Sequence, residues 1–136
     1  CAAQMIGFAV ISFRDNGING LFAQGLGTSM LQIPNIARNP RIWIPPTLAS
    51  AITGPVATVV LGLKNLPAGA GMGTSGLVGP LLSWQAMTAA GETRTKTVVS
   101  IVLVCAVLPA VLSFAAYAPL RKIGWIRDGD MRLEAR

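Results

Sequence analysis

The chain has 136 residues, of which 52% are hydrophobic and only 12% are charged. Soluble domains carry about 25% charged residues, so this composition excludes an ordinary soluble domain and predicts an integral membrane protein. The net charge of +6 does not indicate nucleic-acid binding, because the basic residues stand mostly at the edges of apolar stretches, as interfacial anchors do.

The chain begins with an apolar stretch, residues 1–13, followed by a more polar one, residues 14–40. Residues 1–13 are apolar but too few to cross a bilayer. Because the stretch begins with Cys1 and has no initiator Met, we expect it to be a truncated span. The chain as a whole (residues 1–136) is then a single membrane-domain fragment, the C-terminal part of a longer protein. Residues 14–40, which follow, are polar at their edges and rich in Gly, Asn and Gln.

Two uncharged stretches, residues 42–63 and 97–118, each exceed the ~20 residues that a helix needs to cross a membrane. Pro109 predicts a kink in the second. Residues 65–91 between them are uncharged and glycine-rich. Buried helices of a soluble core are the alternative, but so short a chain cannot build a core around two of them. We therefore predict an all-α, polytopic transmembrane helical bundle.

Basic residues flank both spans, and five of the eleven follow Ala118. We expect residues 119–136 to form a basic C-terminal tail on the cytoplasmic side of the cell membrane. Cys1 and Cys105 form no CxxC motif, and histidine is absent, so we expect no metal, no cofactor and no redox motif. The predicted anchors are Arg38, Arg41, Lys64, Arg94, Lys96, Arg121, Lys122, Arg127, Arg132 and Arg136.

An internal repeat links the two glycine-rich regions. Gly25-Leu-Gly-Thr-Ser-Met-Leu-Gln-Ile-Pro34 and Gly71-Met-Gly-Thr-Ser-Gly-Leu-Val-Gly-Pro80 align without a gap, with six of ten positions identical. We interpret each copy as a broken or re-entrant helix, in which Thr-Ser caps a new helix and the proline limits its length. Such paired interruptions indicate a transporter's binding site. Helix packing through small residues is the alternative.

Four stretches resemble a known family: Phe13-Arg-Asp-Asn-Gly17, Gly25 to Asn35, Arg38-Asn-Pro-Arg-Ile-Trp-Ile-Pro-Pro-Thr-Leu-Ala-Ser50 and Gly69 to Leu77. Together they resemble the second EIIC-type family of sugar permeases of the bacterial phosphotransferase system. The resemblance implies a multi-span permease, expected to be a homodimer in the lipid bilayer, that releases its sugar inward as a phosphate ester. A cytosolic phosphocarrier subunit would supply the phosphate, since this chain lacks histidine and contains no catalytic residue.

Sugars are bound by converging amides, hydroxyls and carboxylates, so the polar residues at the glycine-rich regions are the candidate substrate-binding groups. Interfacial placement, helix capping and interhelical hydrogen bonding are the structural alternatives for these residues. Glu92 is expected to be a solvated loop residue. The candidates are Arg14, Asp15, Asn16, Gln24, Thr28, Ser29, Gln32, Asn35, Thr74 and Ser75.

Two other functions compete with the sugar permease. A non-transporting sensor or structural membrane protein would keep the packing glycines without a converging polar site. An ion-coupled transporter would bury carboxylates or histidines as relays, and the predicted spans contain neither. If the repeated loops line one cavity, we expect them to lie close together, and bulky residues at Gly27 or Gly73 to abolish ligand binding without unfolding the protein.

Overall fold

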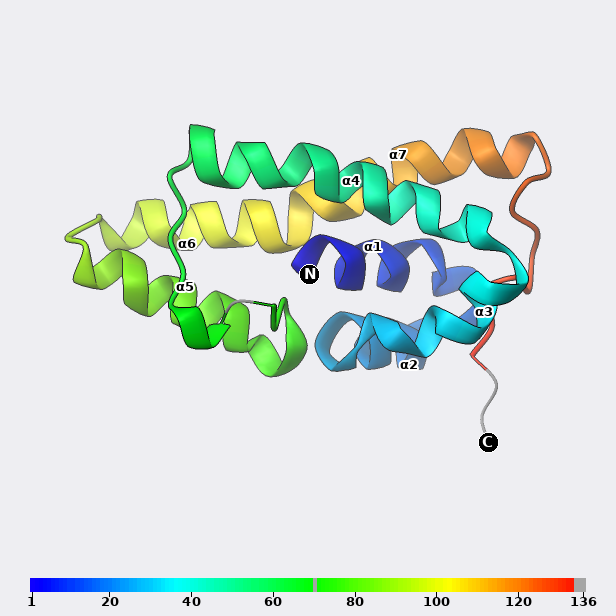
Figure 1. Cartoon of the computed structure of the whole chain (residues 1–136), viewed down its shortest axis with the longest axis horizontal. Coiled ribbons are helices and arrows are strands. Elements are labelled where there is room, and N and C mark those ends of the chain that lie inside the picture. Colours follow the sequence, from blue (N-terminus) through cyan, green and yellow to red (C-terminus); the bar gives the residue numbers. More distant parts are fainter. Residues whose placement is uncertain (70, 134–136) are drawn as a thin grey trace.

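The computed structural model describes residues 1–69 and 71–133, and its regular elements are helices throughout these residues (Figure 1). The all-α prediction is therefore confirmed. Ala70 and the predicted anchor Arg136 lie outside the described residues. The α-helices are α1 (Ala2–Ile11), α2 (Phe13–Phe22), α3 (Ile33–Arg38), α4 (Ile44–Pro55), α5 (Val78–Ala89), α6 (Arg94–Val102) and α7 (Leu108–Lys122).

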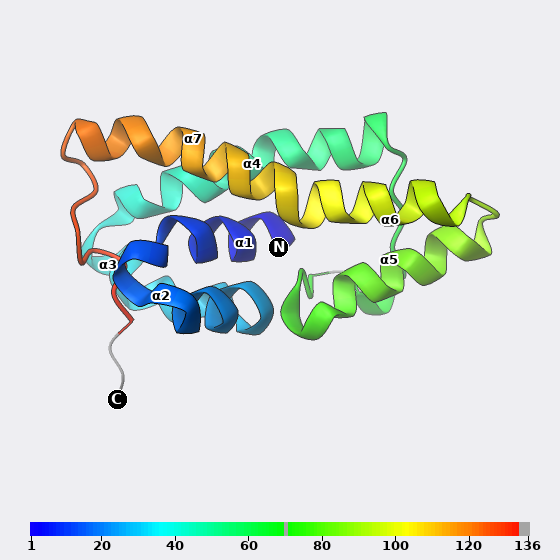
Figure 2. The ribbon, with the colours of Figure 1, turned by 180° about the vertical axis from the view of Figure 1, so that it is seen from behind.

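Two continuous helical segments, Pro40–Val60 and Arg94–Lys122, are long and apolar enough to cross a membrane. They match the two predicted spans to within a few residues. A π-helical turn, Leu103–Val107, joins α6 to α7 directly before Pro109, and the helix axis changes direction there (Figure 2). Proline has no N–H to donate, and the π turn accommodates the missing backbone hydrogen bond. The predicted kink therefore lies at this turn. The predicted tail boundary at residue 119 falls inside α7.

The core of the bundle consists of α1 packed against both α4 and α7. Gly7 makes this close approach possible, because a Cβ atom there would lie 2.6 Å from Ser113 Oγ and 3.0 Å from Pro46 Cβ. Near the C-terminal end of α1, a buried apolar cluster joins α1 to α7 and to the chain beyond it. Its members are Phe8, Ile11, Ile42, Tyr117, Ile126 and Met131.

The two repeat copies share one local feature, although their glycines differ in backbone conformation. In each copy a short 3₁₀ turn, Ser29–Gln32 or Ser75–Leu77, leads directly into an α-helix, α3 or α5. The prediction that the proline limits this helix is wrong. Pro34 and Pro80 instead lie in the first turn of α3 and α5, where a missing backbone N–H costs nothing because it has no helical partner. Both turns lie in the middle of the molecule, and α3 and α5 run from them towards opposite ends (Figure 1).

The cations are unevenly divided between the two ends of the bundle. The end where α4 begins and α7 finishes gathers seven of the ten described Lys and Arg residues. Arg41 belongs to this group, and its guanidinium makes a cation–π contact, 4.9 Å from the ring centroid of Trp125. Lys64, Arg94 and Lys96 lie at the other end. The seven are Arg14, Arg38, Arg41, Arg121, Lys122, Arg127 and Arg132.

Candidate functional site

The two Gly-x-Gly-Thr-Ser loops touch each other. Thr74 Oγ1 donates a hydrogen bond of 2.5 Å to the carbonyl oxygen of Gly25, and the Thr74 side chain is buried. The same hydroxyl lies 3.7 Å from Met5 Sδ on α1. The prediction that the loops lie close together, although corresponding residues are 46 positions apart, is therefore confirmed. That both loops line one cavity stays a prediction.

The threonine side chains of the two loops make different hydrogen bonds. Thr28 caps the turn that follows it, because its Oγ1 accepts a hydrogen bond of 3.1 Å from Met30 N, as predicted. Thr74 makes no such cap, so the capping prediction is wrong for the second copy. Ser29 and Ser75 are half-buried, and their hydroxyls make no hydrogen bond within residues 1–69 and 71–133.

Glycine at positions 73 and 79 lets the second loop pass close to α1. Gly73 has φ +58°, and a Cβ atom there would lie 2.8 Å from Ala2 N and 2.9 Å from Cys1 C. A Cβ atom on Gly79 would collide with the carbonyl oxygen of Gly73, which accepts a hydrogen bond of 3.1 Å from Gly79 N. Residues with a Cβ atom at these two positions would prevent the close backbone contacts of the loop, so the loop requires glycine there.

A cavity of about 240 Å³ opens beside the second loop. Its wall combines backbone of the glycine-rich segment with the side chains of Thr58, Lys64, Asn65 and Ser83. Sequence reasoning missed these residues, because they lie outside the repeated decapeptides. The available signal was a polar residue within an apolar segment: Thr58 lies in a predicted span, and Ser83 lies in an apolar stretch.

Three of the candidate amides form a buried chain. Gln24 Nε2 donates to Ser12 Oγ at 2.7 Å, and Gln24 Oε1 accepts from Gln32 Nε2 at 2.9 Å. Gln32 Oε1 in turn accepts from Asn35 Nδ2 at 2.8 Å. Gln24 and Gln32 are fully buried, and Asn35 is 6% exposed. Buried amides require such partners, because an unpaired one costs several kcal/mol.

The amide chain ends on the C-terminal segment, which we define as residues 128–133. Gln32 Nε2 donates to Met131 O at 2.9 Å, and Asn35 Nδ2 donates to Arg132 O at 3.0 Å. Asn16 bonds the same segment twice: its Nδ2 donates to Met131 O at 2.7 Å and its Oδ1 accepts from Leu133 N at 2.6 Å. The segment thus lies against the side chains of α2 and α3.

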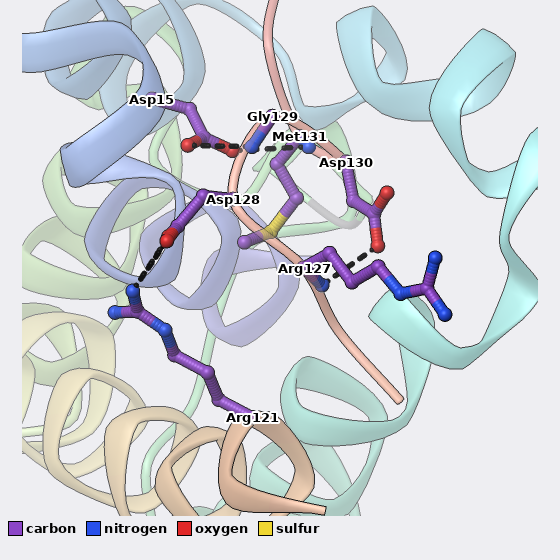
Figure 3. A network of polar contacts seen from close by, with 7 residues as sticks. All are labelled: Asp15, Arg121, Arg127, Asp128, Gly129, Asp130 and Met131. Atoms are coloured by element: carbon purple, nitrogen blue, oxygen red, sulfur yellow. Dashed lines mark hydrogen bonds and ion pairs between the residues drawn. The ribbon is translucent and has the colours of Figure 1, made fainter. Parts of the chain in front are cut away.

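A carboxylate adds to this attachment (Figure 3). Asp15 Oδ1 accepts from Gly129 N at 3.0 Å, and Asp15 Oδ2 accepts from Met131 N at 3.1 Å. Asp130 folds back onto its own turn, where one oxygen accepts from Arg127 N at 2.8 Å, and Arg121 pairs with Asp128 at 2.6 Å. The segment is therefore fixed at several points along its length.

The structure thus divides the ten candidates into four groups. Five of them form the network at the C-terminal segment, four by bonding it directly and Gln24 through Gln32. Thr74 joins the loop contact, and Arg14 is exposed and lines a separate cavity beside α7. Thr28, Ser29 and Ser75 remain at their own turns. A ligand role for at least one amide stays a prediction, because each amide has protein partners here. The five are Asp15, Asn16, Gln24, Gln32 and Asn35.

Sequence reasoning missed the partners of these residues. The chain after residue 119 was expected to be a basic tail, yet Asp128 and Asp130 stand in it with Gly129 between them. An Asp-Gly-Asp sequence is typical of a structured turn and was the available signal. Glu92, by contrast, is in the turn between α5 and α6, as expected. Lys96 Nζ lies 2.8 Å from its carboxylate and lowers the pKa of Glu92.

Comparison with known protein families gives a match over nearly the whole chain. Residues 1–133 match the family model described as Phosphotransferase system, EIIC. A search of curated proteins and a search of solved structures each found no match.

Proposed function

Because the chain belongs to the EIIC family of phosphotransferase-system membrane components, we propose that it binds a sugar and carries it inward for phosphorylation by a partner subunit. Membership places the chain among membrane transport components, and the two apolar spans agree with that. What the proposal adds to family membership is the class of sugar, the site that holds it and the source of the phosphate.

The sugar site proposed here lies where the two Gly-x-Gly-Thr-Ser loops meet. The observation that carries the proposal is the Thr74–Gly25 hydrogen bond, which joins two interrupted helical segments of a repeat in the manner expected of a transporter site. The adjoining cavity of about 240 Å³ is below the ~300 Å³ at which pockets for drug-sized ligands begin, and it suits a monosaccharide. Thr58, Asn65 and Ser83 offer the hydroxyl and amide groups that sugars need.

In this proposal the buried amides act on the first loop. Gln24 precedes Gly25 directly, and Gln32 follows the loop within the same 3₁₀ turn as Ser29. Their mutual hydrogen bond therefore clamps the two ends of the loop. Asp15, Asn16 and Asn35 extend the clamp to the C-terminal segment, so that these five polar residues position the loop.

Phosphate has to come from another protein or domain. Phosphoryl carriers use histidine or an accessible thiolate, whereas this chain has no histidine and Cys105 lies within a span. We place the docking face for a cytosolic phosphocarrier at the end of the bundle with seven cations, which the positive-inside rule assigns to the cytoplasm. A homodimer is part of the same proposal.

The test is uptake of a panel of labelled sugars into vesicles that contain the full-length protein, with and without phosphoenolpyruvate and the soluble carriers. Phosphorylated sugar should accumulate only with the donor. Thr74→Val should reduce uptake about tenfold, the value of one neutral hydrogen bond. The matched control is Thr88→Val, because Thr88 is exposed and bonds only the carbonyl of Trp84 on its own helix. Accumulation of free sugar without a donor contradicts the coupled mechanism.

A non-transporting sensor or structural protein is the second candidate. The observation that favours it is that the side-chain amides of Gln24, Gln32 and Asn35 already form hydrogen bonds with other groups of the chain. Absence of binding for every sugar in the panel, with the protein folded, would select this candidate.

A further inference from the structure

A second cavity, of about 460 Å³, lies between the junction of α1 with α2 and the surface of α7. One part of its wall is apolar, formed by residues such as Val10, Phe13 and Phe114. The other part carries the cations Arg14, Arg121 and Lys122 together with Tyr117. The cavity is separate from the proposed sugar site, because the two have no lining residue in common.

Among the described residues, the cavity wall contains three cations and no carboxylate. Arg121 is partly neutralised by Asp128, at 2.6 Å. Arg14 and Lys122 make no ion pair or hydrogen bond within the part of the chain that the structure describes. The carboxylate next to Arg14 in sequence, Asp15, is occupied by two backbone N–H groups of the C-terminal segment. Two cations are therefore available to an anion.

The position of the cavity indicates where that anion is found. Lys122 is the last residue of the longer span, so the cations lie where the helix leaves the hydrocarbon region. Phe13 and Phe114 remain 47% and 57% exposed on the apolar side. An acidic protein surface would leave these aromatic rings in water, whereas an acyl chain would cover them.

We propose that this cavity binds an anionic phospholipid of the surrounding bilayer. The headgroup phosphate lies between Arg14 and Lys122, with Arg121 adding charge, and an acyl chain runs along Phe114 and Val10. Basic pockets between transmembrane helices on the cytoplasmic side bind anionic headgroups by this combination of charge and apolar surface.

The experiment compares the full-length protein in nanodiscs of neutral phosphatidylcholine with nanodiscs that also contain phosphatidylglycerol of the same acyl chains. Retained lipid is counted by native mass spectrometry. The test variant is Arg14→Gln with Lys122→Gln, and the control is Arg94→Gln with Lys96→Gln, which removes the same charge at the other end. At roughly 1 kcal/mol for each cation, the test variant should retain phosphatidylglycerol about thirtyfold less well, and the control should behave as the unmodified protein does.

Three results would overturn the proposal: equal loss in both double variants, equal retention of the neutral lipid, or displacement of phosphatidylglycerol by inorganic phosphate at the same concentration. The last would identify a site for a soluble anion. Binding of the phosphocarrier that depends on Arg14 and Lys122, without lipid retention, would assign the cavity to that protein instead. Both side chains are exposed, so the test variant should melt like the unmodified protein in neutral nanodiscs. If it fails to fold, Lys122→Gln alone provides the same comparison.

Discussion

Gly73 and Gly27 occupy the same place in the two repeat copies, yet the structure predicts opposite responses to alanine. At Gly73 a side chain would adopt left-handed backbone, which costs about 1–2 kcal/mol. It would also press on backbone atoms of Cys1 and Ala2 at 2.8–2.9 Å, and overpacking of this kind costs about 1–3 kcal/mol. The sum is a loss of about 2–5 kcal/mol in the free energy of unfolding.

Gly27 is the matched control, because a Cβ atom there meets no atom within 4 Å and its φ is ordinary. Gly27→Ala should change stability by no more than about 1 kcal/mol. Thermal melting of both variants in the same detergent measures the difference, with Gly73→Ala expected to melt about 10 °C or more below Gly27→Ala. Equal melting temperatures would refute the close approach of the second loop to α1. Loss of sugar binding in folded Gly27→Ala would place the first loop in the site.

Three further predictions address other parts of the molecule. Gln32→Met keeps side-chain bulk but leaves the buried Gln24 Oε1 without its partner, which should cost about 1–3 kcal/mol and speed tryptic cleavage near Met131; unchanged cleavage would show that the amide does not hold the segment. Lys96→Gln should raise the pKa of Glu92 towards its ordinary value in an NMR titration. Since that pKa is lowered in the fold, any stability from the pair is present above the unfolded pKa and lost as the pH falls through the folded value. A cysteine at position 132, in a background without Cys1 and Cys105, should react with an impermeant reagent only after permeabilisation; ready labelling of intact cells would reverse the orientation.

Local patterns predicted the elements that depend on local chemistry. Uncharged length predicted both spans, and Pro109 predicted the change of direction within the second. The identical Gly-x-Gly-Thr-Ser strings predicted two alike turns and their proximity. The role of each proline was mistaken, because a proline after a cap is compatible both with ending a helix and with beginning one, and only the backbone distinguishes them.

The candidate site was predictable as a set of residue types but not as a set of partners. Asp15, Asn16, Gln32 and Asn35 were selected as polar groups that could converge on a sugar, and in the structure their hydrogen bonds go to the chain itself. Their partners are main-chain groups about 100 positions away, and a backbone N–H or C=O carries no mark in the sequence. The cavity beside Thr58 and Ser83 was unpredictable for the same reason, since it arises from packing between distant elements.

The attachment of the C-terminal segment also has a consequence for synthesis of the protein. The hydrogen bonds from Asn35 and Asn16 to this segment join residues 97 to 117 positions apart, with both apolar spans made largely or wholly in between. At about 5–20 residues per second, the ribosome needs roughly 5–20 s to supply the missing partners. During that interval the carboxamides of Asn16 and Asn35 lack these partners and must stay hydrated or be held by the insertion machinery. Premature release of the nascent chain would therefore leave a half-inserted protein, recognisable to quality-control proteases by its uncovered amides.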